Sequence, residues 1–444
     1  MGNKRALLIC SVSFLGNMLY GYDSIVNGAS VSMPSFLLYF GSIGLTGSAY
    51  LPSIWTSLWN SMSLLCQAIG ALMVGSISDR FGRKWPACAA ATLTIGGTAM
   101  QYYAESRGLL LAGRMVNGLG IGVVVIMSMT YASEVAPLRL KGVFQQGLVL
   151  FYVFMMAVGL AVIRIYVPQM APQAFRNVFA IQWAVAGINA LAFAATPESP
   201  NFLISKGRLP QARNVMALIY GKNNSIDDRL AYLNKVIRKE QANKALQSGS
   251  YIECFKGVDI RRTLTVNWGG AAFLSQSIYF LIIAGLPSIH AFDVSIGGFG
   301  LAMIIIVLSW ILGGKVRRRD AFMAACILNF LFMLTIGALY YAPGSSGLWG
   351  IAVLMLRAKT LSIGVITQTL ARFIVPYIYN VDAGNFGART GFVFAGLSVL
   401  LIIGTWYIVP ETTGLTMEEI DKAYIDKITV RAFQTRIGSG QVEA

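Results

Sequence analysis

Charged side chains are scarce in this sequence. Asp, Glu, Lys and Arg together make up 12% of the 444 residues, against about 25% in an ordinary soluble domain. Hydrophobic residues make up 56%, and the mean hydropathy is +0.62. So little charge excludes an ordinary soluble fold and indicates an integral membrane protein, whose surroundings are the lipid bilayer.

Residues that carry chemistry in enzymes are also few. The chain has one histidine and five cysteines. The cysteines lie mostly inside apolar runs and lack the spacing of a metal site or a disulfide framework. No nucleophile motif or nucleotide-binding loop stands out in the sequence. A membrane-bound enzyme is therefore the least supported class, and we expect a protein that is not an enzyme and that needs no cofactor or metal.

Acidic residues number 19 against 35 basic ones, which gives a net charge of +16. In a soluble chain this excess would suggest a nucleic-acid partner, but here the basic residues lie in short segments between alternate apolar runs. Cytoplasmic loops of membrane proteins carry such an excess of Lys and Arg. We therefore interpret the charge as membrane topology, with both chain ends in the cytoplasm and no nucleic-acid partner.

Eleven apolar runs approach the length of about 20 residues that crosses a bilayer. The first is too long for a signal peptide and carries an aspartate, so we expect a retained span. Between the sixth and seventh runs, residues 197–262 hold 12 Lys and Arg against six Asp and Glu, which predicts a cytoplasmic linker with helices such as 230–245. The runs are 6–33, 52–78, 85–103, 108–133, 143–165, 178–196, 263–286, 295–314, 321–342, 360–379 and 390–409.

The two halves of the chain repeat. The segment Leu138-Arg-Leu-Lys-Gly142 returns as Leu356-Arg-Ala-Lys-Thr360, and Pro197-Glu198 returns as Pro410-Glu411. Such a duplication is typical of transporters whose site lies between two helical bundles. The predicted divisions are an N-terminal helical bundle over 1–196, the linker over 197–262, a shortened C-terminal helical bundle over 263–410 and a cytoplasmic tail over 411–444.

The second half is short by 17 residues in one place. From Arg83 to Arg139 is 56 residues, whereas the matching distance from Arg318 to Arg357 is 39. The missing length is about one span, and residues 347–356 are the remaining candidate for a tenth crossing. Ten helical residues rise about 15 Å, half of the hydrocarbon thickness. We thus expect an all-α polytopic membrane protein that lacks most of its tenth helix.

Several segments carry a family resemblance. Residues 75–84 match G-x-x-x-D-R-x-G-R-[RK], and this turn resembles the signature loop of the major facilitator superfamily. Segments that resemble sugar porter signatures are 113–122, 131–137, 197–203 and 410–419, and those that resemble the fungal α-glucoside (maltose) permeases are 179–183, 356–360 and 387–392. The resemblance implies a major facilitator fold of two six-helix bundles, alternating access and the proton-coupled uptake of sugar that is common in that group.

The apolar run 6–33 contains Asp23, and an ionised carboxylate inside a span costs at least about 2.5 kcal/mol. Counted from the extracellular ends of their spans, Asp23 and Arg114 lie about 15 and 9 Å deep, so their side chains are expected to meet. The resemblance implies that this pair couples proton movement to transport, with protonation of the acid releasing it. The alternative is a static ion pair.

The resemblance also implies a cytoplasmic gate, a network of charged side chains that locks the outward-open state. The positions that match it are Asp79, Arg80, Arg83, Glu134, Lys141 and Glu198. Family members usually have arginine where Lys141 stands, and lysine lacks the bidentate fork of arginine. The alternative is that these residues only set the membrane topology.

The resemblance is weakest at the sugar site. Sugar porters hold hydroxyl groups with glutamine and asparagine side chains, but two of these glutamine positions correspond to Met156 and Val266 here. The remaining polar candidates for sugar binding are Gln182, Asn267, Gln276, Tyr279 and Gln368. Loss of hydroxyl-binding groups lowers affinity and discrimination, so the identity of the sugar stays open.

These observations together predict a monomeric, multi-pass transporter of the plasma membrane. It is expected to move an α-glucoside or a hexose by alternating access, with protons as the coupling ion. Two alternatives remain. One is a non-transporting, sensor-like relative, which a predicted tail of 34 residues does not favour. The other is the inactive product of a truncated gene model, which the deficit of 17 residues does favour.

Overall fold

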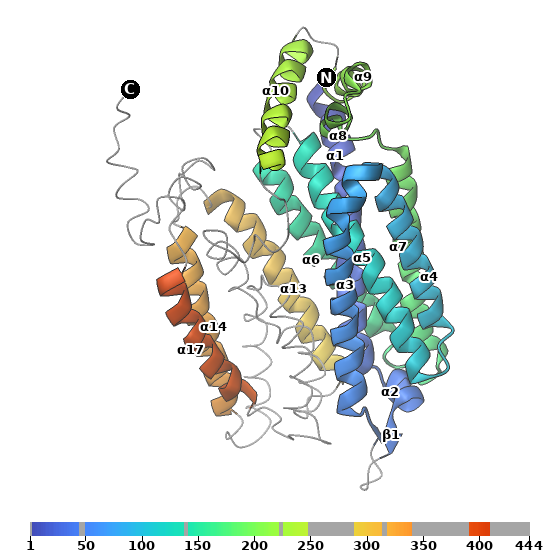
Figure 1. Cartoon of the computed structure of the whole chain (residues 1–444). Coiled ribbons are helices and arrows are strands. Elements are labelled where there is room, and N and C mark those ends of the chain that lie inside the picture. The colour runs from blue at the N-terminus through green and yellow to red at the C-terminus, as the bar shows by residue number, and fades with distance from the viewer. Residues whose placement is uncertain are drawn as a thin grey trace.

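The computed structural model describes residues 2–43, 49–136, 141–221, 225–246, 288–312, 318–339 and 390–408. These residues are almost wholly helical, with one pair of two-residue strands. The long helices of the first half form one bundle (Figure 1). Two helices of the second half, α14 and α17, pack on each other apart from that bundle (Figure 1).

Each of the six apolar runs predicted before the linker lies in one long helix. The run 6–33 corresponds to α1 (Gly2–Ala29), which continues into the short 3-10 helix η1 (Ser30–Ser32). The other five helices are α3 (Ser53–Phe81), α4 (Lys84–Tyr102), α5 (Arg107–Val135), α6 (Lys141–Tyr166) and α7 (Gln173–Ala195). The prediction is confirmed because an apolar run of this length satisfies its backbone polar groups only as a helix.

Residues 34–51, between the first two predicted spans, have structure of their own. They include α2 (Pro34–Phe40) and two strands, β1 (Ser42–Ile43) and β2 (Ala49–Tyr50), which pair antiparallel. Arg107 at the start of α5 fixes this segment, because its guanidinium donates to the backbone oxygens of Phe40 and Gly41 at 2.8 and 2.9 Å.

The linker that follows α7 begins with three helices at the end of the bundle where the chain starts (Figure 1). They are α8 (Pro200–Ser205), α9 (Leu209–Tyr220) and α10 (Ser225–Leu246), and the last contains the predicted helix 230–245. The helices α8 and α9 pack on each other, and α10 packs on both. The described residues of the linker up to 246 are therefore mainly helical.

Three helices of the second half are described: α13 (Ser288–Leu312), α14 (Arg318–Leu339) and α17 (Thr390–Ile408). Residues 287–294 separate two of the predicted spans, but α13 already begins at Ser288 and includes His290 in its first turn. The predicted spans 263–286 and 360–379 and the candidate half-span 347–356 lie outside the described residues. Within the described part of the chain, five helices are long and apolar enough to cross a membrane, namely α3, α5, α6, α7 and α13.

The helices α3 and α4 pack on α5 through glycines. A Cβ atom built on Gly122 of α5 would lie 2.1 Å from the backbone oxygen of Gln67 in α3, and one built on Gly118 would lie 2.4 Å from that of Ser63. A Cβ atom built on Gly120 would lie 2.8 Å from the backbone oxygen of Ala90 in α4. Since only hydrogen fits at these positions, the three glycines permit α3, α4 and α5 to pack closely.

Two neighbouring glycines of α4 provide a test of this packing. A Cβ on Gly97 would lie 2.5 Å from the backbone nitrogen of Asn117 in α5, whereas one on Gly96 would meet nothing within 4 Å. We expect Gly97→Ala to destabilise the bundle by about 1–3 kcal/mol, because α4 and α5 must separate. Gly96→Ala should leave stability unchanged or slightly raised, because alanine favours the helix. Thermal unfolding of both purified variants checks this, and equal midpoints would contradict it.

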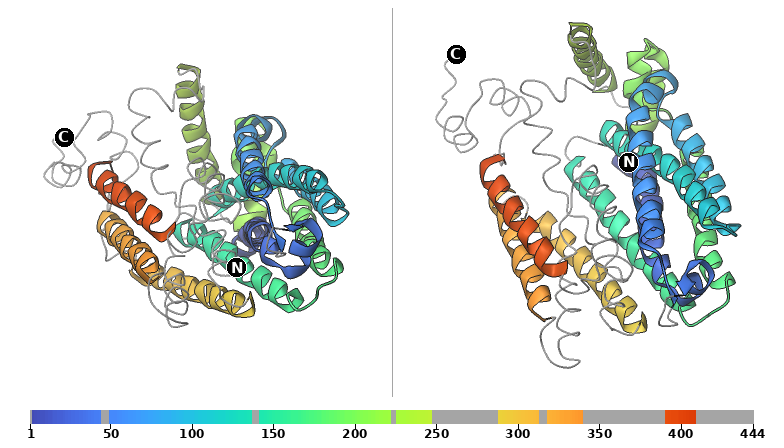
Figure 2. Two further views of the ribbon diagram at one scale, coloured as in Figure 1. Left: turned by 90° about the horizontal axis from the view of Figure 1, so that it is seen from below. Right: turned by 60° about the horizontal axis from the view of Figure 1, so that its bottom comes forward.

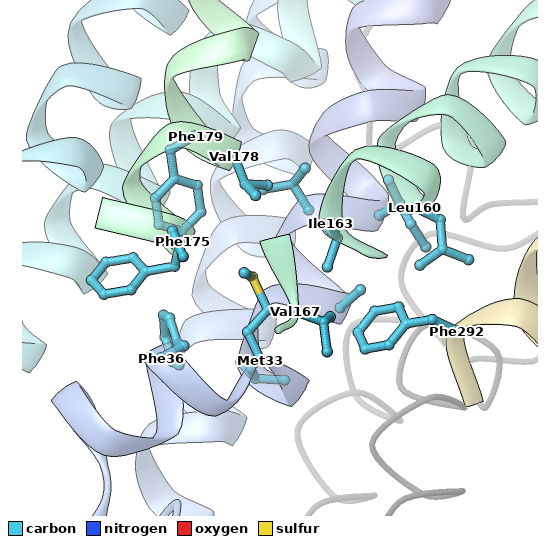
Figure 3. Packing of buried hydrophobic residues seen from close by; sticks show 14 of the residues in the cluster. Met33, Phe36, Leu160, Ile163, Val167, Phe175, Val178, Phe179 and Phe292 are labelled. Atoms are coloured by element: carbon cyan, nitrogen blue, oxygen red, sulfur yellow. The ribbon is translucent and has the colours of Figure 1, made fainter. Parts of the chain in front are cut away.

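The helix α13 packs against the first half of the chain. Its Phe292 shares an apolar cluster with Leu160 and Ile163 near the end of α6 and with Val167 just after it (Figure 3). Beside this cluster, Nε of Arg164 lies 2.6 Å from Oδ1 of Asp293, in an ion pair between side chains that are 40% and 45% exposed. The helices α6 and α13 run next to each other from this point (Figure 2). We call these residues the α6–α13 contact.

Candidate functional site: two polar clusters in the first bundle

Asp23 lies in the buried interior of the first bundle. It is on α1, and its residue exposure is 1%. The three helices α3, α5 and α7 each contribute one carboxamide that donates a hydrogen bond to its carboxylate. The donors are Gln67 Nε2, at 3.5 Å from Oδ2, Gln182 Nε2, at 3.0 Å from Oδ1, and Asn117 Nδ2, which also bonds Oδ1. We call Asp23, Gln67, Asn117 and Gln182 the Asp23 cluster.

The amides of the Asp23 cluster also bond to each other. Nε2 of Gln182 lies 3.5 Å from Oδ1 of Asn117, so Asp23, Asn117 and Gln182 close a triangle of hydrogen bonds. Hydrogen bonds to an ionised group contribute about 1.5–3 kcal/mol each. The cluster therefore offsets much of the cost of placing a carboxylate in the core of a membrane bundle.

Arg114 is also fully buried, but it does not pair with Asp23. Its Nη2 donates to Oγ of Ser30 at 3.2 Å, and its guanidinium carbon lies 5.7 Å from the centre of the Trp59 ring. In the described part of the chain, its Nε and Nη1 have no hydrogen-bond partner. The expected direct ion pair between Asp23 and Arg114 is therefore absent. Among the described residues, the ion pairs within 4.0 Å are Arg83–Glu134, Arg164–Asp293 and Arg213–Asp227. The two charges still interact electrostatically.

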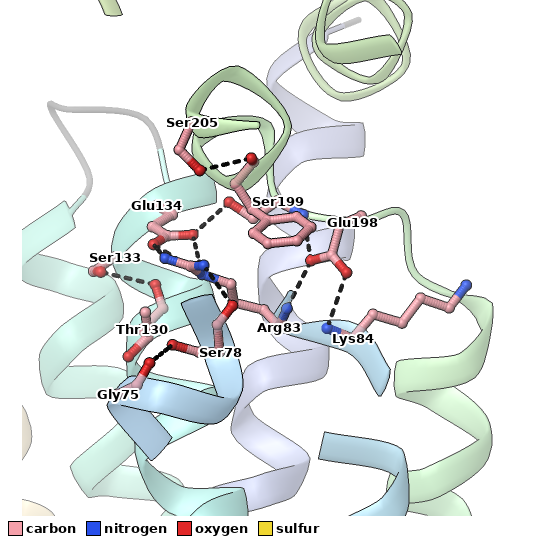
Figure 4. A network of polar contacts seen from close by, with 11 residues as sticks. Gly75, Ser78, Arg83, Lys84, Thr130, Ser133, Glu134, Glu198, Ser199 and Ser205 are labelled. Atoms are coloured by element: carbon pink, nitrogen blue, oxygen red, sulfur yellow. Dashed lines mark hydrogen bonds and ion pairs between the residues drawn. The ribbon is translucent and has the colours of Figure 1, made fainter. Parts of the chain in front are cut away.

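A second polar cluster lies at the end of the bundle where α3 ends and α4 begins (Figure 4). The guanidinium of Arg83 forms a bidentate ion pair with the carboxylate of Glu134 on α5, with Nη2 at 2.8 Å from Oε1 and Nε at 3.1 Å from Oε2. The side chains of this pair are 13% and 12% exposed. Oγ of Ser199 donates to the same carboxylate, and Nη1 of Arg83 donates to the backbone oxygen of Ser78 at 3.2 Å.

Glu198 completes this cluster by capping α4 from outside the helix. Its Oε1 accepts from the backbone nitrogen of Arg83 at 2.9 Å, and its Oε2 accepts from that of Lys84 at 3.4 Å. A carboxylate at a helix N-terminus satisfies free N–H groups and favours the helix dipole. Gly82 makes room for it, with φ at +88° and no side chain, because a Cβ there would lie 2.3 Å from Oε2. We call Arg83, Glu134, Glu198 and Ser199 the Arg83 cluster.

Of the six predicted gate residues, the structure brings three together: Arg83, Glu134 and Glu198. Asp79 and Arg80 are exposed in the last turn of α3, where the Arg80 guanidinium lies over the Phe81 ring. Lys141 is the first residue of α6. The network at this end therefore ties together α3, α4, α5 and α8 with one arginine and two glutamates.

Among the predicted sugar-binding residues, Gln182 is the one that the structure describes. It is 1% exposed and donates to Asp23, so it lies in the Asp23 cluster. Asn267, Gln276, Tyr279 and Gln368 lie outside the described residues. Met156 packs against the apolar cluster that includes Tyr22 and Leu160.

The sequence alone did not single out Asn117, Gln67 or Ser199. Asn117 follows Arg114 by three residues and so shares its helix face, which is a signal that could have been used. Gln67 is a carboxamide inside an apolar run, where polar side chains are expensive and tend to be functional. Ser199 has no such signal, because a serine after Pro-Glu is ordinary at a helix start.

A family model described as "Sugar (and other) transporter" matches residues 9–356 and 292–424. The chain belongs to this family of transporters. Its curated relatives include "MFS transporter fmqE" of Aspergillus fumigatus, at 38% identity over 91% of this chain and 83% of that protein. They also include "General alpha-glucoside permease" of Saccharomyces cerevisiae, at 26% identity over 95% of this chain and 75% of that one.

Solved structures agree on the fold of this transporter. The proton:xylose symporter XylE bound to 6-bromo-6-deoxy-D-glucose matches with a TM-score of 0.72 at 20% identity, over 96% of this chain and 100% of that one. An inward-open structure of the xylose transporter XylE from E. coli matches with a TM-score of 0.68, also at 20% identity, over 94% and 99%. The transporter therefore has the major facilitator fold, and it is a multi-pass membrane protein.

Proposed function

We propose that this transporter takes up a sugar, an α-glucoside or a hexose, together with protons across the plasma membrane by alternating access. The observation that carries the proposal is the Asp23 cluster. A carboxylate at 1% exposure inside a bundle of membrane helices is expensive and is retained where it carries protons or substrate. Relatives named as α-glucoside permeases support the substrate class, and the fold shared with a proton:xylose symporter supports the coupling.

Proton carriage, sugar contact and gating fall to different residues in this proposal. Asp23 is the group that takes up and releases the proton, and Arg114 is the nearby fixed charge that acts on it. Gln182, with Asn267, Gln276, Tyr279 and Gln368, remains a candidate for contact with the sugar. The Arg83 cluster holds the cytoplasmic ends of α3, α4 and α5 together and serves as the gate, to which Asp79, Arg80 and Lys141 add charge.

The test is uptake of labelled maltose and labelled glucose by cells that lack their own carriers. We expect accumulation above the outside concentration, and we expect a proton uncoupler to abolish the accumulation. Cells that carry the empty expression vector are the matched background. If neither sugar enters at a rate above the background while the protein reaches the plasma membrane, a non-transporting relative or an inactive product of a truncated gene model is favoured instead.

A second candidate is transport of a substrate with fewer hydroxyl groups than a sugar. The observation behind it is Met156, which stands where related carriers have a hydroxyl-binding glutamine and which packs on apolar residues. A rise in the unfolding temperature of the purified protein on addition of maltose or glucose would argue against this candidate. No rise with either sugar, combined with a rise for less polar compounds, would favour it.

A further inference from the structure

The Asp23 carboxylate is held by carboxamides and not by the arginine. Three amide groups from α3, α5 and α7 donate to it, and the side chain of Asn27 on α1 also hydrogen-bonds to it. Arg114 is engaged with Ser30 and the ring of Trp59. Trp59 is itself fixed, because its Nε1 donates to the backbone oxygen of Arg107 at 3.2 Å. The acid and the arginine thus have separate sets of neutral partners in this state of the transporter.

Carboxamides differ from arginine in one respect that matters for a group that binds a proton. Arginine only donates hydrogen bonds, whereas an amide carries both donors and an acceptor. Rotation of the terminal amide by half a turn exchanges its nitrogen and oxygen. The same side chain can therefore donate to the carboxylate and, after that rotation, accept from the protonated acid.

We propose that Asn117 and Gln182 are positioning residues that hold Asp23 in both of its protonation states, so that the acid keeps its hydrogen bonds throughout the transport cycle without Arg114. The triangle that these two residues form with Asp23 supplies the geometry. A buried acid without such partners would be held in one protonation state, because the other state would leave a buried polar group without a hydrogen bond, which is costly. This inference rests on the proposed proton coupling at Asp23.

Arg114 of α5 is the charged group that acts on Asp23 among the described residues. The helices α3 and α7 present amides to the acid. Next to it on α1, Gly21 faces the backbone carbonyl of Tyr152 and the Cβ of Met155 in α6, so α6 presents uncharged atoms there. Replacing the amide of Asn117 or Gln182 with a hydrocarbon side chain therefore alters the hydrogen bonding of Asp23 and leaves the charges around it in place.

The test measures sugar uptake against external pH for Asn117→Leu and Gln182→Leu, with labelled glucose and labelled maltose as probes. Removing a donor from the ionised carboxylate favours the protonated acid. We therefore expect the pH at which uptake falls to half to rise by about one unit in each variant, a tenfold change in proton concentration. Gln101→Leu is the matched control, because Gln101 of α4 is equally buried and lies against Gly113, and the profile should not move.

A second measurement does not depend on the sugar. Thermal unfolding of the purified protein should show that Asn117→Leu loses more stability at alkaline pH, where Asp23 is ionised, than at acid pH. Asn117→Ser keeps a group that donates and accepts, so it should show a smaller difference and it replaces the leucine variant if that fails to fold. Equal losses at both pH values, matching the Gln101→Leu control, would overturn the proposal.

The outcomes separate this inference from the proposed function. If Asp23→Asn abolishes accumulation while the amide variants keep the pH profile of the original protein, the coupling stands and the positioning role is wrong. If accumulation is insensitive to an uncoupler and to Asp23→Asn, the proposed coupling itself is wrong.

Discussion

Replacement of Asp23 by asparagine is expected to abolish accumulation of sugar, so that the inside concentration only reaches the outside one. Asparagine keeps the shape of the side chain and can bond to the three amides of the Asp23 cluster, so the bundle should still fold. It cannot bind and release a proton, so the downhill flow of protons no longer drives the sugar. Exchange of labelled for unlabelled sugar across the membrane should persist, because exchange needs no change in protonation.

The matched control is Glu105→Gln, the same loss of a carboxylate at an exposed position before α5. It should leave accumulation unchanged. Accumulation by Asp23→Asn that an uncoupler still abolishes would show that another group carries the proton. Recovery of full transport on adding Arg114→Ala to Asp23→Asn would favour a static electrostatic role for the two residues, because two opposite buried charges are then removed together.

Glu134→Gln should be the most destabilising single change at the Arg83 cluster. The substitution leaves the largely buried guanidinium of Arg83 with a neutral partner. It also weakens the bidentate contact that joins α4 to α5. Loss of one partner of such a pair costs about 3 kcal/mol. Arg83→Lys should lose less stability than Glu134→Gln but more than a surface change, because lysine keeps the charge without the fork.

The control for Glu134→Gln is Asp227→Asn. Asp227 pairs with Arg213 between α9 and α10 at 2.7 Å, but both side chains are 60% exposed. The hydrogen bond from Arg213 lowers the pKa of the Asp227 carboxyl, yet exposed pairs contribute little to stability. We expect no measurable change in its unfolding temperature. If Glu134→Gln unfolds at the same temperature as Asp227→Asn, the Arg83 cluster does not stabilise this end of the bundle.

The helices of the first half were predictable because an apolar run that crosses a bilayer can satisfy its backbone hydrogen bonds only as a helix. The segment between α1 and α3 was not, since α2 has only seven residues and depends on Arg107 for its position. The start of α13 was also missed, because Ser288, His290 and Asp293 interrupt the apolar run that the predicted span 295–314 continues.

The candidate site was predictable in its charged members and not in its neutral ones. Counting residues along α1 and α5 put Asp23 and Arg114 at similar depth, and both are buried in the same bundle. Depth does not determine which side chain reaches which, and the amides at 67, 117 and 182 come from three different helices. The Arg83 cluster was easier to predict, because all four of its members stand in matched motifs and three of them are charged.

The α6–α13 contact determines what kind of motion the described part of the molecule allows. It lies at one end of α6, and the Arg83 cluster lies at the other end of the same bundle (Figure 1). From Arg164 back to Lys141, α6 extends about 35 Å. If α6 and α13 stay packed where Phe292 meets Leu160, a rotation of about 10° around that point moves the far end of α6 by about 6 Å, roughly the length of one helical turn. In that case a small rotation at Phe292 would displace the opposite end of α6 by about the width of a small molecule.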